Sequence, residues 1–201
     1  MKKTLTFILF FLIGTAAFAS GIQPMDALKG PIDRVIGVLK DPQYQAADQK
    51  SRQRDKMWEI VQGVFDFQEI SRRTLANNWK LLSPGQQKEF VDVFSEFLGN
   101  TYLDKIQGEY KNEKVLYLGQ DTLSETKVLI RTKILRENNV EVPVDYSMLL
   151  RDQGWKIYDV NIEGVSLVQN YRSQFSQILM KETPAQLIER LKKKREEQKK
   201  I

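Results

Sequence analysis

The chain has 201 residues, with 31 Lys and Arg against 26 Asp and Glu, and it contains neither cysteine nor histidine. Without cysteine no disulfide can form, and without histidine the chain lacks the commonest general base and the commonest transition-metal ligand. We therefore expect no metal site, no cofactor, and a single domain that depends on its packed core for stability.

The net charge of +5 is unevenly distributed. Lys2 and Lys3 carry two of these charges, and residues 190–201 carry a balance of +5, which leaves −2 on residues 20–189. Because binding to a phosphate backbone needs a basic face, the body of the protein is not predicted to bind nucleic acid. Residues 190–201 are predicted to form a basic tail that frays into solvent, with weak attraction to an anionic membrane surface as the alternative.

Residues 1–19 have the pattern of a secretory signal peptide. A basic start is followed by the apolar stretch from Leu5 to Ile13 and by the small-x-small site Ala17-Phe18-Ala19. The apolar stretch is shorter than the roughly 20 residues of a spanning helix. We therefore expect export to the periplasm with cleavage before Ser20, and one domain over residues 20–189.

Helical periodicity follows the signal. A first amphipathic stretch spans Met25 to Leu39, with Gly30-Pro31 as a break or a late start. A second runs from about Gln49 to Val64, and a short third stretch begins at Phe65.

A long helix is predicted to begin at Ser83-Pro84-Gly85-Gln86, which has a serine N-cap, a proline in the first turn and a glutamine placed for a capping box. It is expected to reach about Gly108. Its apolar stripe is unusually aromatic, which fits either ordinary core packing or the wall of a cavity. The stripe comprises Phe90, Phe94, Phe97, Leu98, Tyr102 and Ile106.

From Glu113 onward the apolar period changes to two, which is typical of strands with one apolar and one wet face. Turn residues at Asn138-Asn139 and at Asp152-Gln153-Gly154 separate the apolar runs, so a meander of four antiparallel strands is predicted.

The fourth strand, Gly154 to Ile162, leads directly into a helix with Val165, Val168, Tyr171 and Phe175 on one side. Gly164 permits a sharp turn, so this helix is predicted to fold back across the sheet. Thr183-Pro184-Ala185-Gln186 repeats the capping box and begins a terminal helix. The fold class is therefore α+β: N-terminal helices, a four-stranded antiparallel curved sheet, and C-terminal helices packed over it.

The run Gly154 to Phe175 resembles the MlaC family, also called toluene-tolerance auxiliary proteins. The stretch Leu75 to Trp79, followed by Ser83 to Phe90 and by Thr101-Tyr102, carries the same resemblance. The resemblance implies a periplasmic phospholipid carrier with a curved sheet and helices on its concave side, related to the nuclear-transport-factor-like fold. It also implies partners: an inner-membrane ABC transporter complex with an MCE-domain protein, and an outer-membrane lipoprotein complex.

The hypothesis that follows places the acyl chains of a phospholipid between the apolar sheet face and the helices. In it, one group of residues forms the sheet face and a second group closes it. The sheet group is Val128, Ile130, Val142, Val144, Tyr146, Met148, Trp155 and Ile157; the closing group is Phe90, Phe94, Phe97, Tyr102, Val165, Val168, Tyr171 and Phe175. Arg172 flanks the closing helix, where it is a candidate for a head-group phosphate or for a surface salt bridge.

Two other classes of function remain open. A small enzyme on the same fold would use a carboxylate as its base, and the candidates are Asp145 and Asp159. Alternation places Asp145 in water, and it places Asp159 on the face of Trp155 and Ile157 unless a β-bulge intervenes. An envelope adaptor would have a fully packed interior and would carry no lipid.

Overall fold

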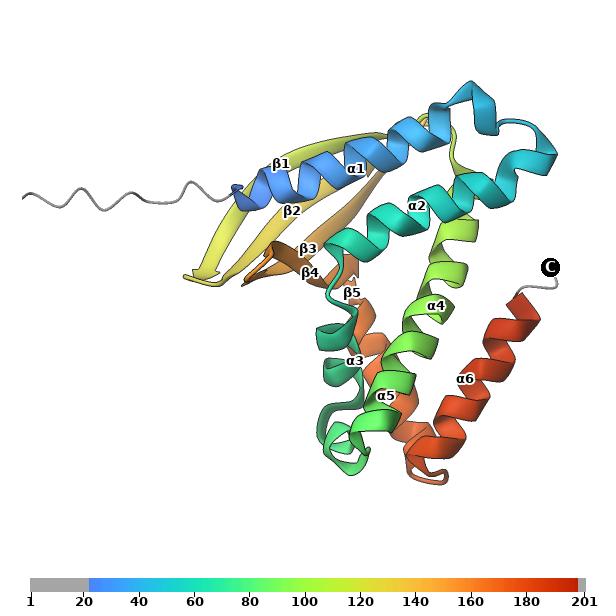
Figure 1. Cartoon of the computed structure of the whole chain (residues 1–201). Helices are drawn as coiled ribbons and strands as arrows, with labels where there is room; N and C mark the ends of the chain where they lie inside the picture. The colour runs from blue at the N-terminus through green and yellow to red at the C-terminus, as the bar shows by residue number, and fades with distance from the viewer. Residues whose placement is uncertain (1–21, 199–201) are drawn as a thin grey trace, which may run out of the picture.

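The structure is a computed structural model that describes residues 22–198, so the predicted signal peptide over residues 1–19 lies outside the described residues. Within this range the chain forms an antiparallel sheet, a helical layer against it and a separate group of helices (Figure 1). The helices are α1 (Pro24–Lys40), α2 (Lys50–Val64), α3 (Phe67–Leu75), α4 (Pro84–Glu109), α5 (Leu167–Leu179) and α6 (Pro184–Gln198), and the strands are β1 (Lys114–Ser124), β2 (Lys127–Leu135), β3 (Glu141–Arg151), β4 (Gly154–Ile162) and β5 (Val165–Ser166).

The sheet has the order β1-β2-β3-β4-β5, and every neighbouring pair is antiparallel. The predicted α+β class and the meander are confirmed, but the sheet has five strands and not four. The extra strand arises at Glu163-Gly164, where both residues have positive φ angles, of 51° and 85°. A two-residue turn of this kind matches strand twist, so Val165 pairs with Ile162 before α5 begins at Leu167.

A β-bulge interrupts the pairing of β3 with β4. Ser147 faces Asp159 and Met148 faces Ile157, which leaves Tyr158 as the extra residue. Because one inserted residue reverses the side on which the next side chains point, Ile157 lies on the buried face and Asp159 on the opposite one. The β-bulge that the sequence left as a possibility is therefore present, and Asp159 does not share the face of Trp155 and Ile157.

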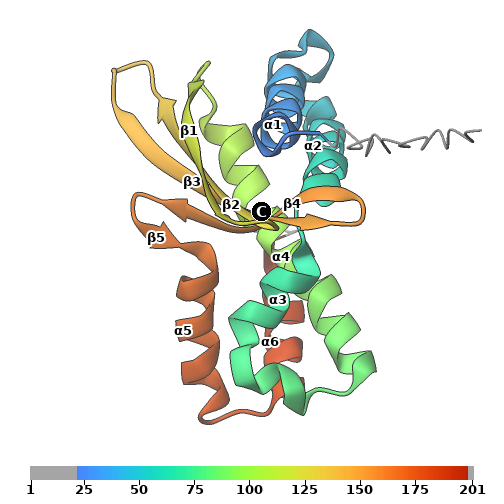
Figure 2. The same ribbon diagram turned by 90° about the vertical axis from the view of Figure 1, so that its left-hand side faces the viewer.

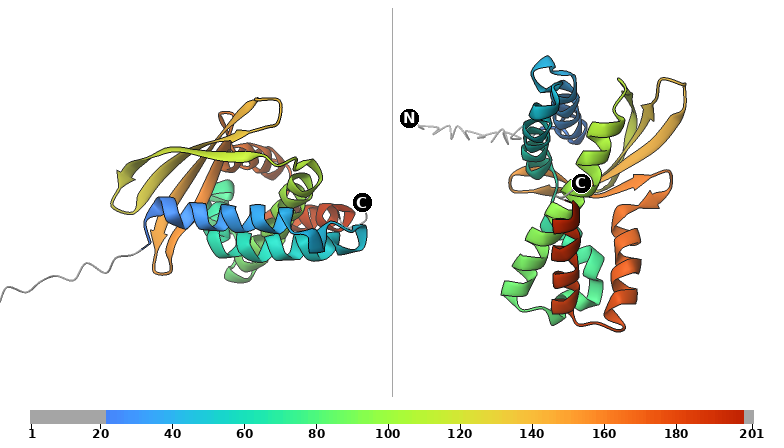
Figure 3. Two further views of the ribbon diagram at one scale, coloured as in Figure 1. Left: turned by 90° about the horizontal axis from the view of Figure 1, so that it is seen from above. Right: turned by 90° about the vertical axis from the view of Figure 1, so that its right-hand side faces the viewer.

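The apolar face of the sheet is covered by α1. Leu28 of α1 is completely buried against this face, and Met25, Ala27 and Ile32 pack around it. Seen from above, α1 lies between the sheet and α2 (Figure 3). The helix continues through Pro31, although the break at Gly30-Pro31 was one predicted possibility. Leu28 and Ile32, which lie on either side of that break, both contact the sheet, and this packing stabilises the helix across the missing N–H donor.

The helices α3, α5 and α6 pack with α4 in a second group below the sheet (Figure 2). The prediction that the helix after Gly164 folds back across the sheet is wrong. Its apolar side chains Tyr171 and Phe175 contact Phe90 and Phe94 of α4 instead, and these aromatic rings pack together in one cluster. The capping box predicted at Ser83 is confirmed, and it starts α4 one residue later, at Pro84.

The predicted fraying from residue 190 is wrong as far as the structure extends. The helix α6 runs to Gln198, and Leu191 is only 3% exposed against α4. Two of its cations pair with α4 carboxylates, Lys192 with Glu89 at 2.6 Å and Arg195 with Glu96 at 3.0 Å. The basic run therefore contributes cations to the contact between α6 and α4. Residues 199–201 lie outside the described residues.

A cluster of charges connects the helical group to the sheet. The carboxylate of Glu69 in α3, with a side chain only 9% exposed, accepts hydrogen bonds from Arg72 and Arg73 at 2.6–2.9 Å. Arg151 at the end of β3 donates to Asp66 at 2.8 Å, and the guanidinium of Arg73 lies 4.1 Å from the ring centre of Tyr158 in β4. Burial alone would raise the pKa of Glu69, but the hydrogen bonds from the two arginines outweigh it and lower the pKa below its ordinary value of 4.5.

Replacing Glu69 by glutamine is expected to lower the free energy of unfolding at pH 7 by about 2 kcal/mol, because hydrogen bonds to charged groups are lost at a buried site. A carboxylate with a lowered pKa stabilises the fold above its unfolded-state pKa, and this contribution is lost as the pH falls through the folded-state value. The difference between wild type and Glu69→Gln, measured by urea denaturation, should thus be largest at neutral pH and shrink below pH 4.5. A difference that stayed constant into acid would show that the ionised form is not responsible.

Candidate functional site

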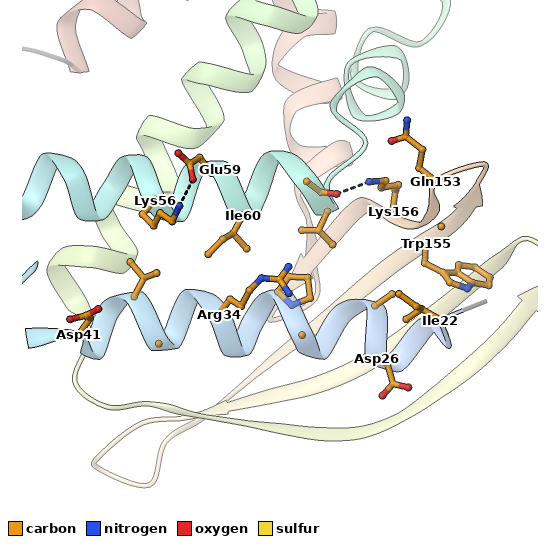
Figure 4. Close-up of a pocket in the computed structure, with 18 of the residues that line it drawn as sticks. Ile22, Asp26, Arg34, Asp41, Lys56, Glu59, Ile60, Gln153, Trp155 and Lys156 are labelled. Atoms are coloured by element: carbon orange, nitrogen blue, oxygen red, sulfur yellow. Dashed lines mark hydrogen bonds and ion pairs between the residues drawn. The ribbon is translucent and has the colours of Figure 1, made fainter. Parts of the chain in front are cut away.

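An open groove lies between α1, α2 and the turn that joins β3 to β4 (Figure 4). Its cavity volume is about 810 Å³, within the usual range of roughly 300–1,000 Å³ for ligand pockets. The lining residues come from α1 and the residues on either side of it, from α2, and from the β3–β4 turn and the start of β4: Ile22, Asp26, Ala27, Gly30, Pro31, Arg34, Gly37, Val38, Asp41, Gln43, Tyr44, Lys56, Glu59, Ile60, Gly63, Val64, Gln153, Gly154, Trp155 and Lys156.

Glycines leave the space open. Three of the lining residues, Gly30 and Gly37 of α1 and Gly63 of α2, present no side chain to the groove. A Cβ atom placed on Gly37 or on Gly63 would meet no other atom within 4 Å. Neither helix needs a glycine there for its backbone, since glycine is less favourable than alanine in a helix by about 1 kcal/mol. The glycines thus keep the seam between the helices hollow at a cost in helix stability.

The groove is continuous with the apolar face of the sheet. Ala27, Val64 and Trp155 line the groove and also belong to the apolar cluster between α1 and the sheet. In this structure the cluster itself is filled by side chains, chiefly those of Leu28, Ile130 and Met148, which are all completely buried. A long apolar ligand in the groove would therefore border directly on further apolar surface. That surface becomes accessible to the ligand if α1 moves away from the sheet.

Two tyrosines lie within this sheet cluster. The hydroxyl of Tyr117 in β1 is buried without a hydrogen-bond partner among the described residues, and burial, followed by the charge of Asp33, raises its pKa to about 12. Burial also raises the pKa of Tyr146 in β3, with a smaller contribution from Tyr117. Both phenols stay neutral at physiological pH, so the face beneath α1 has hydroxyl groups but no charge.

The predicted lipid-binding residues fall into two clusters and not one. All eight residues of the sheet group lie together on the face beneath α1. The closing group, Val165 excepted, lies instead in the helical cluster, where Phe90, Phe94, Val168, Tyr171 and Phe175 are buried and Phe97 and Tyr102 pack against them. Val165 is 59% exposed at the edge of the sheet. The prediction that these helices close the sheet face is therefore wrong, because α1 occupies that position.

Arg172 lies on α5 with the helical cluster, away from the groove. Its Nε donates a hydrogen bond to the backbone carbonyl of Arg73 at 2.9 Å, which ties α5 to α3. This is a structural contact between helices, and the groove has a different arginine, Arg34, on its α1 side.

The two carboxylates considered for catalysis have no catalytic surroundings in the described chain. Asp159 accepts hydrogen bonds from the Ser166 hydroxyl at 2.6 Å and from the Val168 N–H at 3.0 Å, so both of its oxygens serve the start of α5. Asp145 pairs in register with Arg131 and Asn161 on the sheet face opposite α1, as alternation predicts. Neither residue lines the groove.

Residues 22–198 contain no helix with the length and hydropathy needed to cross a bilayer. Nor do His, Cys, Asp or Glu side chains gather in threes as a metal site would require in this part of the chain. The expectation that the protein uses no cofactor stays a prediction.

Sequence reasoning missed most of the groove and found only Trp155 among its lining residues. Gly30, Gly37 and Gly63 were the available signal, since glycines inside amphipathic helices have a cost that packing or function must offset. The polar lining residues gave no pattern of their own, because they come from three separate segments.

An α+β fold with a helix laid over an open antiparallel sheet, and an apolar recess beside that helix, defines a class of protein suited to holding an apolar ligand. Comparison with known proteins specifies the class further. The sequence model of the MlaC protein family matches residues 29–193, and the chain belongs to this family.

Two similar proteins support the assignment. The toluene tolerance protein Ttg2D of Pseudomonas putida is 22% identical over 163 residues, which cover 79% of this chain and 74% of that protein. The phospholipid-binding protein from Ralstonia solanacearum, solved in complex with a phospholipid, superimposes with a TM-score of 0.76 at 24% identity, covering 88% of this chain and 98% of that one. The second comparison shows that the two chains share their fold.

Proposed function

We propose that this protein is a periplasmic phospholipid carrier that binds acyl chains along the groove between α1 and α2 and beneath α1 on the sheet. The observation that carries the proposal is a groove of about 810 Å³ that joins the apolar sheet face, in a chain of the MlaC family. The phospholipid bound by the Ralstonia protein of the same fold supports the choice of ligand. Export by the signal peptide over residues 1–19 would bring the protein to the periplasm.

Energetics favour a carrier that keeps its cargo out of water. Burying one acyl chain of about 16 carbons at roughly 0.8 kcal/mol per methylene contributes on the order of 12 kcal/mol before the costs of binding. Release into water would be correspondingly slow. The lipid would leave only where another apolar environment is offered. The resemblance to the family implies two partners that would offer one: an inner-membrane ABC transporter complex with an MCE-domain protein, and an outer-membrane lipoprotein complex.

The proposed role involves no covalent chemistry. The carboxylates considered as bases are engaged at the start of α5 or lie on the far face of the sheet, and neither faces the groove. We therefore assign the protein to binding and transport of lipid, and not to catalysis.

The experiment is native mass spectrometry of the mature protein, purified from the envelope fraction without detergent, with lipid analysis of the organic extract. The expected result is a stoichiometric complex with phospholipid. If gently handled protein has the bare mass of the chain, and added phospholipid vesicles do not load it, the carrier function is refuted. The envelope adaptor with a packed interior would then be the better description.

A further inference from the structure

Arg34 lies over the groove in an unusual position. It belongs to α1, its side chain is exposed, and its Nη1 lies 3.6 Å from the point where a Cβ atom of residue 30 would be. The side chain therefore folds back by one turn along the helix, over the space that Gly30 leaves free. Figure 4 shows it on the side of α1 that faces α2, where Ile60 also lines the groove.

The charge of Arg34 is not neutralised within the groove. Three cations line the groove, and two have partners: Lys56 pairs with Glu59 at 2.7 Å, and Lys156 donates to the carbonyl oxygen of Gly63 at 2.6 Å. Arg34 makes neither a hydrogen bond nor an ion pair with any residue in the range 22–198. Its five N–H donors are available to a ligand.

Arg34 stands at a boundary between two kinds of lining. Toward the sheet the groove is mainly apolar, and toward the loop that joins α1 to α2 it is mainly polar (Figure 4). The half toward the sheet has the apolar residues Ile22, Ala27, Pro31, Val64 and Trp155, with Asp26, Gln153 and Lys156 among them. The half toward the loop has Asp41, Gln43, Tyr44, Lys56 and Glu59, with the apolar side chains of Val38 and Ile60 among them. A ligand that matches this lining is an amphiphile with its charged group near Arg34.

We propose that Arg34 binds the phosphate of an amphiphile whose acyl chain occupies the apolar half of the groove and whose remaining head group occupies the polar half. The proposal rests on the proposed function and specifies the ligand chemistry and the anchoring residue. A guanidinium suits this task because its planar fork donates two parallel hydrogen bonds to the oxygens of a phosphate, a geometry that an ammonium group does not match. The pair Lys56 and Glu59 offers both signs of charge to the rest of the head group.

The test is isothermal titration calorimetry of the delipidated mature protein with four probes, each kept below its critical micelle concentration where it has one. Dodecylphosphocholine has a phosphate and a chain, dodecyl maltoside has the same chain without charge, dodecanoate replaces phosphate by carboxylate, and inorganic phosphate has no chain. The variants are Arg34→Gln and Arg34→Lys. Arg52→Gln is the matched control, because Arg52 lies exposed on α2, outside the groove, and its guanidinium donates a hydrogen bond to the neighbouring Gln49 side chain.

We expect Arg34→Gln to weaken dodecylphosphocholine about tenfold or more, since charge-assisted hydrogen bonds are lost, and to leave dodecyl maltoside unchanged. Arg34→Lys should restore part of the affinity, and Arg52→Gln should behave as wild type. Thermal denaturation of the variants should match that of the wild type, because Arg34 has no hydrogen-bond or ion-pair partner among residues 22–198 that could be lost.

Two results would overturn the assignment of Arg34. One is unchanged dodecylphosphocholine binding by Arg34→Gln, and the other is inorganic phosphate that binds as tightly as dodecylphosphocholine, which would make the site one for a free anion. Dodecanoate is also expected to bind Arg34→Gln more weakly than wild type, because a carboxylate accepts the same pair of hydrogen bonds from a guanidinium. Failure of the wild type to bind any of the amphiphiles would instead refute the carrier function itself. The two failures are therefore distinguishable.

Discussion

Replacing Phe94 by alanine is expected to lower the free energy of unfolding by about 3–5 kcal/mol, the range found for large aromatic side chains removed from cores. Phe94 of α4 has no exposed surface. Its ring centre lies 5.1 Å from those of Tyr171 and Phe175 in α5 and 5.4 Å from that of Phe90. The substitution would remove the ring that joins α4 to α5, and urea denaturation at neutral pH would measure the loss.

Phe97→Ala provides the comparison. Phe97 lies on the same helix but is only partly buried, and its ring centre is farther from those of its neighbours, 6.5 Å from Phe94 and 6.1 Å from Tyr171. A smaller loss is expected there. Because the aromatic cluster is separate from the sheet face and the groove, a folded Phe94→Leu protein should retain its bound phospholipid. Loss of lipid from folded Phe94→Leu would show that the α4–α5 cluster belongs to the binding site after all.

Local signals in the sequence predicted the elements well, because their causes are local. The capping boxes at Ser83 and Thr183 and the turn at Gly154 all form as predicted, since each depends on residues within a few positions of one another. The alternation of apolar residues likewise predicted which side of the sheet is buried for β2 and β3.

Which helix covers the sheet could not be predicted in the same way. The hydrophobic effect is not directional, so the apolar sheet face would accept the aromatic stripe of α4 as readily as the aliphatic stripe of α1. Which helix covers the sheet depends on all the tertiary contacts together. Phe90 and Phe94 pack against α5, and Leu28 packs against the sheet. The bulge at Tyr158 could be given only as a possibility for a similar reason, because it depends on pairing with a second strand.

The terminal helix illustrates how charge can mislead. The run from Arg190 has the composition of a solvated tail, yet Lys192 and Arg195 face carboxylates of α4 that lie about one hundred residues earlier in the chain. Leu191 then becomes buried between the two helices. Exposed ion pairs contribute little individually, so we attribute most of this contact to Leu187, Ile188 and Leu191.

The groove is the hardest feature to predict, because it forms where residues without side chains lie next to one another. In the sequence Gly37 and Gly63 signal only that packing or function offsets their cost in a helix, and they mark the groove once the two helices lie side by side. The structure therefore supplies variants that fill the groove without disturbing a contact.

Replacing Gly63 by leucine is expected to abolish most phospholipid binding while preserving the fold. The new side chain would enter open space, because a Cβ atom at position 63 has no neighbour within 4 Å. The hydrogen bond that the Lys156 ammonium donates is accepted by the backbone carbonyl of residue 63, which the substitution retains. Leucine is the better helix former by roughly 0.5–1 kcal/mol, so the lipid-free variant should be at least as stable as the wild type. Phospholipid affinity should fall about tenfold or more, equivalent to 1.4 kcal/mol or more.

Gly108→Leu is the matched control, since Gly108 near the end of α4 also has open space around its Cβ position and does not line the groove. The melting temperature of each delipidated variant would be measured with and without added phospholipid, because a ligand that binds the folded state raises it. Wild type and Gly108→Leu should gain stability from lipid, whereas Gly63→Leu should gain almost none. An equal rise in melting temperature in all three proteins would show that the lipid binds outside the groove. The filled sheet face beneath α1 would then have to open to admit the lipid. A loss confined to Gly63→Leu would instead make the seam between α1 and α2 the route by which acyl chains reach the sheet.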